Sequence, residues 1–162
     1  MVDAQGMKSQ GEIEAAVCDV ISRFQQEYMG RGPRDIHTRL IDNKLFVHLQ
    51  GVLTPVEQRL IESHRNGNGN GNGNGSGSGN GNGTGTGSGD GDGSGDGRGA
   101  ELLKQLRSYL VLTGRPLLES MIGDVTGMKP VSVHHEFSTV TGEEVIVFTL
   151  AAAPNMRDRK RK

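Results

Sequence analysis

The feature that most constrains this chain is a run of alternating glycines between Asn66 and Gly99. Every odd position from Gly67 to Gly99 is glycine, and the even positions carry Asn, Ser, Thr, Asp and finally Arg98. Glycine loses the most backbone entropy on ordering, and these side chains offer no apolar area in return. We therefore predict a disordered Gly-X linker over 66–99. Without these 34 residues, 128 of the 162 remain, which suits one compact domain and not two.

Two helical patterns precede the linker. The first spans about 9–29, where Ser9 and Glu12 have the spacing of a capping box and apolar residues recur at intervals of three and four. The residues before it, 1–8, are predicted to be disordered. A shorter helix is predicted from Thr54, which has the same capping spacing, to about His64.

A third helical pattern follows the linker, with leucines and other apolar residues recurring from Leu102 to Val125. Gly114 and Pro116 interrupt it. Because proline lacks a backbone donor and clashes with the preceding turn, we predict a kink or a fresh helix start there. Gly127 is predicted to end the helix.

Two β-hairpins are predicted, one in each half of the chain. Residues alternate with a period of two over 35–41, and again over 44–50, where Leu45, Val47 and Leu49 alternate with Phe46 and His48. The pair Asp42-Asn43 between the two stretches is typical of a tight turn. A second hairpin is predicted over 131–150, with its turn around residues 139–142.

The predicted fold class is α+β. Two hairpins can pair into a four-stranded antiparallel sheet, and helices with one apolar face can cover one side of it. We predict a single domain over 9–150 that contains the linker, followed by a basic tail over 151–162. Phe24 of the first helix and Val147 of the last strand are predicted to be buried in its core.

Histidines on the predicted strands are the candidates for a binding site. If the hairpins pair, His37 and His134 could meet, and with Glu136 they offer ligands that zinc or iron accepts. Against this, the chain has no Cys-x-x-Cys or His-x-x-x-His spacing, and His134 and His135 must point to opposite faces of a strand. A metal site and half-exposed strand histidines both remain open. The sequence identifies no catalytic residue and no cofactor, and it favours a protein that is not an enzyme.

The composition of the chain limits which partners it can bind and in which cellular compartment it is expected. A net charge of −1 and 4% aromatic residues argue against nucleic-acid binding, although the basic tail from Arg157 to Lys162 leaves it as an alternative. Cys18 is the only cysteine, so no intrachain disulfide can form, which fits a reducing cytoplasm. No apolar run approaches the roughly 18 residues of a membrane helix. We expect a soluble cytoplasmic protein.

Several short motifs resemble the MpsC-like family. They are Gly32-Pro33, the stretch from Leu45 to Glu57, Arg115-Pro116, and the turn from Ser138 to Glu143 with the strand after it. The resemblance covers about 8–65 and 100–150. The family takes its name from a proposed sodium-translocating, membrane-potential-generating system in bacteria. The resemblance implies an accessory or regulatory protein whose protein partners are subunits of a membrane ion-transport system, and it supplies no catalytic residue.

The long linker departs from the shorter, often charged connection expected in that family. It puts in doubt any function located in this loop, and it leaves the predicted fold intact. The linker is also long enough for one half of the chain to join a neighbouring chain. A homodimer therefore remains open beside a monomer.

Overall fold

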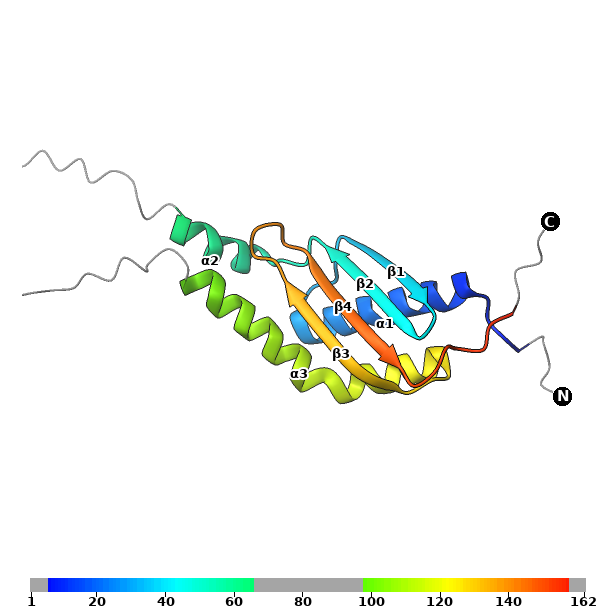
Figure 1. The fold of residues 1–162 in the computed structure, drawn as a ribbon. Coiled ribbons are helices and arrows are strands. Elements are labelled where there is room, and N and C mark those ends of the chain that lie inside the picture. Colours follow the sequence, from blue (N-terminus) through cyan, green and yellow to red (C-terminus); the bar gives the residue numbers. More distant parts are fainter. Residues whose placement is uncertain (1–5, 66–97, 158–162) are drawn as a thin grey trace, which may run out of the picture.

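The computed structural model describes residues 6–65 and 98–157 (Figure 1). These form, in order, α1 (Gln10–Met29), β1 (Asp35–Ile41), β2 (Lys44–Gln50), α2 (Pro55–Arg65), α3 (Arg98–Thr126), β3 (Pro130–Phe137) and β4 (Glu144–Leu150). The predictions for 1–5, for most of the linker (66–97) and for the end of the basic tail (158–162) lie outside the described residues.

The four strands form one antiparallel sheet in the order β1-β2-β4-β3. Each hairpin supplies one edge strand and one central strand, and the hairpins join through β2 and β4. α1 and α3 pack together on one face of this sheet, while no helix of the described residues covers the opposite, open face (Figure 1). The predicted α+β fold, with a four-stranded antiparallel sheet and helices on one face, is therefore confirmed.

α1 begins at the predicted capping box. The Ser9 hydroxyl accepts a hydrogen bond from the Glu12 amide at 3.3 Å, and the Glu12 carboxylate accepts one from the Ser9 amide at 2.6 Å. This backbone amide lowers the pKa of Glu12. The helix ends at Gly30, whose φ of 75° is a left-handed conformation that glycine adopts without strain. Its buried apolar stripe consists of Ile13, Val17, Ile21 and Phe24.

α3 is longer and more continuous than predicted. It starts at Arg98, so the predicted linker extends too far at that end, and it continues through Pro116 to Thr126. Pro116 is exposed, and packing on both sides of it holds the helix together despite the missing backbone donor. The buried residues before and after the proline keep helical spacing: Leu103, Arg107, Val111, Gly114, Leu118 and Ile122.

The predicted burial of the core is half correct. Phe24 is fully buried, as predicted, but Val147 is only half-buried. Successive strand residues point to opposite faces, and the inner face of β4 belongs to the even positions, including Ile146 and Phe148. Val147 therefore lies on the open face of the sheet.

We expect Gly114→Ala to destabilise the protein. A Cβ atom at this position would lie 2.5 Å from two ring carbons of Phe24 and 3.2 Å from the ring of Tyr28. Overpacking of this kind costs about 1–3 kcal/mol, which outweighs the better helix propensity of alanine. The measurement is the free energy of unfolding in urea.

The matched control is Gly123→Ala in the same helix. The nearest atom to a Cβ there is the Met128 carbonyl oxygen at 3.9 Å, so alanine fits without displacement. This variant should be as stable as the wild type or up to about 1 kcal/mol more stable. Equal stability of the two variants would show that α1 and α3 do not pack this closely at Gly114.

Candidate functional site

The structure does not bring the predicted metal ligands together. His37 lies on β1, whereas His134 and Glu136 lie on β3, and these two strands are opposite edges of the sheet with β2 and β4 between them. The shared site expected from the pairing of the hairpins is therefore not formed. Over 6–65 and 98–157, no group of three or more His, Cys, Asp or Glu residues is placed to hold a metal ion.

The same three side chains lie on the open face among weak ion pairs. The His37 ring nitrogen Nε2 is 3.1 Å from Asp35, and Lys104 Nζ is 2.6 Å from Glu136. The hydrogen bond from Lys104 lowers the pKa of Glu136. His134 is exposed. Solvent screens such exposed pairs, so they contribute little to stability.

A different polar cluster lies in the interior, centred on Glu144 at the start of β4. Its side chain has no exposed surface, and three side chains form hydrogen bonds with it. Gln25 Nε2 from α1 lies 3.1 Å from both carboxylate oxygens, and Arg107 Nη1 from α3 lies 3.3 Å from Oε2. His135 Nε2 from β3 lies 2.7 Å from Oε1, within hydrogen-bond distance.

Arg107 connects this cluster to α2. Its Nη2 donates to the Val52 carbonyl at 2.8 Å and to the Glu57 carboxylate at 2.9 Å. Glu57 also caps α2, because its carboxylate accepts the Thr54 amide at 2.7 Å. The guanidinium carbon of Arg107 lies 4.8 Å from the centre of the Phe137 ring, a cation–π geometry. One fully buried arginine thus joins both packed layers to the helix that leads into the linker.

The cluster gathers several charged and polar side chains. One guanidinium faces two carboxylates, Glu57 and Glu144, and Gln25 and His135 make further hydrogen bonds to Glu144. Within the described residues, the buried atoms Gln25 Oε1, Arg107 Nε and His135 Nδ1 have no hydrogen-bond partner. A buried cluster of this kind is stable only while its charges stay paired, since an unpaired interior charge is costly. Its enclosed side chains connect structural elements and are not presented to a ligand.

The sequence analysis missed this cluster, although the sequence carries a signal for it. Arg107 falls at helical spacing between Leu103 and Val111, in the stripe that faces the core. Glu144 falls in step with Ile146 on the inner face of β4. A charged residue inside an apolar stripe predicts a buried ion, but only the fold shows that these two ions meet.

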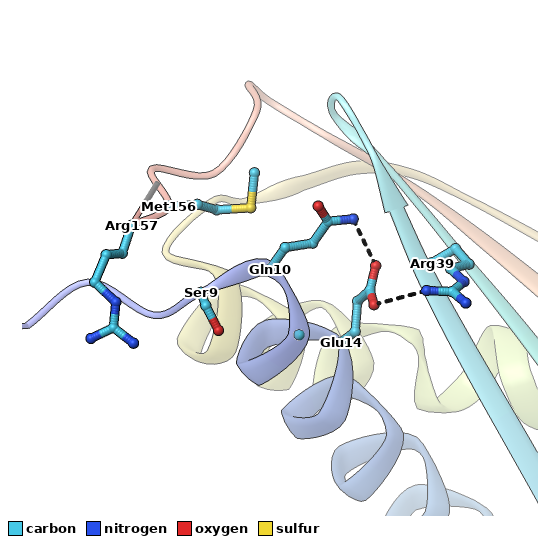
Figure 2. Close-up of a pocket in the computed structure, with 7 residues that line it drawn as sticks. Ser9, Gln10, Glu14, Arg39, Met156 and Arg157 are labelled. Atoms are coloured by element: carbon cyan, nitrogen blue, oxygen red, sulfur yellow. Dashed lines mark hydrogen bonds and ion pairs between the residues drawn. The ribbon is translucent and has the colours of Figure 1, made fainter. Parts of the chain in front are cut away.

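A polar pocket of about 400 Å³ opens at the start of α1, where both ends of the described chain come together (Figure 2). Its central group is the Glu14 carboxylate, which lies 3.6 Å from Arg39 Nη1 and accepts from Gln10 Nε2 at 2.9 Å. Glu14 also accepts the backbone amide of Leu40 at 3.0 Å. These contacts pair the Glu14 carboxylate and hold α1 against the edge of the sheet.

The outer edge of β1 is closed by the same contacts. The backbone of Leu40 donates to Glu14 and accepts from Gln10 at 3.0 Å, and the Cys18 thiol lies 3.2 Å from the Thr38 hydroxyl. An edge strand with free backbone groups invites pairing with other chains. Side chains of α1 therefore protect this edge, and Cys18 has a packing role there.

These features define a class: a two-layer α+β domain with an open sheet face and an ionic cluster between sheet and helices. The chain belongs to the MpsC family. It matches the family described as "Na+-translocating membrane potential-generating system (MpsC)" over residues 9–69 and 94–152, which confirms the resemblance noted from its motifs. No helix of the described residues has the length and apolar character needed to cross a membrane.

A relative and the solved structures complete the comparison. The chain is 29% identical over 143 residues to the "Uncharacterized protein YbcI" of Bacillus subtilis (strain 168), and the match covers 88% of this chain and 89% of that protein. No solved structure matches the chain.

Proposed function

We propose that this chain is a soluble cytoplasmic accessory or regulatory protein that acts through contacts with subunits of a membrane ion-transport system. Membership of the MpsC family, whose description names a Na+-translocating membrane potential-generating system, carries this proposal. A protein of this kind changes the activity of membrane-embedded subunits by binding them.

The open face of the sheet is the surface that we assign to this contact. Phe46 on β2 and Val145 on β4 lie on it, 40% and 38% exposed, with the half-buried Val147 beside them. Arg39 and Glu136 lie toward its two edges. An apolar centre with a polar and charged rim is typical of protein interfaces, and no helix of the described residues covers this face (Figure 1).

Neither of the two alternative functions considered from the sequence, metal binding and nucleic-acid binding, gains support. The metal-binding alternative relied on His37 and His134, which lie on opposite edges of the sheet. For nucleic-acid binding through the basic tail, residues 158–162 lie outside the described part of the chain. Arg157, the first basic residue of that tail, lies 3.5 Å from Glu12.

The test is deletion of the gene in its native host, with the membrane potential followed by a potential-sensitive dye during sodium loading. We expect the deletion strain to hold a lower potential than the wild type. The wild-type gene should restore it, and Phe46→Glu should not, because a carboxylate would be buried at the centre of the contact. Affinity purification from membranes should recover ion-transport subunits with the wild-type protein and lose them with Phe46→Glu.

The matched control is Val140→Glu, which changes an 85% exposed valine in the turn between β3 and β4. It should restore the potential as the wild type does. Both variants must keep the wild-type circular dichroism spectrum. An unchanged potential in the deletion strain, with no transport subunit recovered, would contradict the proposed function.

A further inference from the structure

α3 carries a second uncovered surface, on the side turned away from the sheet. Five large side chains on it are between 39% and 65% exposed: Leu102, Leu106, Tyr109, Leu112 and Leu117. Their spacing places them on one side of the helix, opposite the buried stripe that packs on the sheet. We call this surface the uncharged face of α3.

This face has no charge along its centre. The residues that separate its apolar side chains are polar or small: Gln105, Thr113, Pro116 and Ser120. Charged residues appear at its two ends, Arg98 and Asp124, and both are exposed. Further charges border it at Glu101 and Glu119. Monomeric proteins rarely expose apolar patches of this extent, and depletion of charge at the centre marks a protein interface.

Nothing else in the chain is suited to cover this face. The segments outside the described residues are 1–5, 66–97 and 158–162. The long segment contains only Gly, Asn, Ser, Thr and Asp, and the last contains only Asp, Arg and Lys. The first offers only Met1 and Val2 as sizeable apolar side chains. These segments therefore supply little apolar surface for such a cover.

We infer that the cover is a second copy of this chain, whose α3 packs antiparallel on the first about a two-fold axis. The two end charges have opposite sign and lie on the same side of the helix, about 39 Å apart at 1.5 Å per residue. In an antiparallel pair centred halfway between them, near position 111, Arg98 of each copy lies beside Asp124 of the other. A parallel pair would instead bring like charges together at both ends.

The same arrangement pairs the apolar side chains. Tyr109 and Leu112 lie next to the two-fold axis and contact their counterparts, while Leu106 and Leu102 of each copy reach the turns at and after Leu117 of the other. The area buried is on the order of 1,000 Å² in total, at the lower end for specific interfaces. We therefore expect a dimer that dissociates at micromolar concentrations. Because this face is opposite the open face of the sheet, the dimer is independent of the proposed contact with transport subunits.

The first test is the mass of the full-length protein by sedimentation equilibrium over a range of concentrations. The wild type should approach twice the mass of one chain, and Leu106→Glu should remain at the mass of one chain. Val140→Glu, an exposed valine away from this face, should associate as the wild type does. Unchanged circular dichroism must show that both variants fold.

The second test addresses the antiparallel register. Arg98→Asp and Asp124→Arg should each raise the dissociation constant several-fold at low salt, and the double exchange should restore it. A monomeric wild type at every concentration would overturn the inference and assign the face to a different protein or to a membrane surface. A dimer that tolerates Leu106→Glu, or a double exchange that stays as weak as the single ones, would overturn it as well.

Discussion

Replacing Arg107 with methionine should lower the free energy of unfolding by about 3–5 kcal/mol. Methionine keeps much of the volume of the arginine stem but removes the guanidinium that pairs with Glu144, whose side chain has no exposed surface. Glu57 and the Val52 carbonyl lose their shared donor at the same time. The measurement is equilibrium unfolding in urea, followed by circular dichroism.

Two control experiments test whether the destabilisation by Arg107→Met comes from the buried ion pair, and not from removing an arginine as such. Arg115 pairs with Glu119 on the same helix at 2.6 Å, but both side chains are partly exposed, so Arg115→Met should cost less than about 1 kcal/mol. Adding Glu144→Gln to Arg107→Met should recover part of the loss, because it removes the uncompensated buried charge. Similar costs for Arg107→Met and Arg115→Met would refute the interior ionic cluster.

Phe24→Ala should also cost roughly 3–5 kcal/mol, as truncation of a buried aromatic side chain does. The ring is fully buried and stacks on Tyr28 with the ring centres 4.5 Å apart. It also occupies the space beside Gly114 where α1 and α3 approach each other. Thermal and urea unfolding measure the loss, and a cost below about 1 kcal/mol would mean that this helix face is not in the core.

A double variant tests the contact itself. Gly114→Ala is expected to be destabilising because its Cβ would collide with the Phe24 ring. Once Phe24→Ala has removed that ring, the added methyl group fills part of the cavity, and Gly114→Ala should become neutral or stabilising. Additive costs of the two substitutions would show that the side chains at these positions do not touch.

Most of the secondary structure could be predicted because its signals are local. Leu45, Val47 and Leu49 alternate with Phe46 and His48, and they are buried on one face of β2. Asp42, in the turn between β1 and β2, has a φ of 53°, a conformation that Asp and Asn tolerate. Such preferences depend on a residue and its near neighbours, so the printed sequence contains them.

The candidate site could not be predicted in the same way. The order of the strands in the sheet determines how far apart His37 and His134 lie. Because the hairpins pair through β2 and β4, these histidines lie at opposite edges. The position of Pro116 on the exposed side of α3 decided that the helix continues, where the sequence allowed a break. Both outcomes depend on contacts between residues that are distant along the chain.

The sequence by itself determined the helices, the hairpins, the α+β class and the family. The signals for them are helix caps, alternating strand residues, turn residues and short motifs, and each of these depends only on residues that are close together along the chain. The tertiary structure alone decided that Arg107 meets Glu144, that Val147 faces outward, and that one side of α3 is left uncovered. The physical reason is that a buried ion pair, the inner face of a sheet and the free face of a helix exist only after distant segments have packed. Each of these features belongs to at least two elements, and no single stretch of sequence contains it.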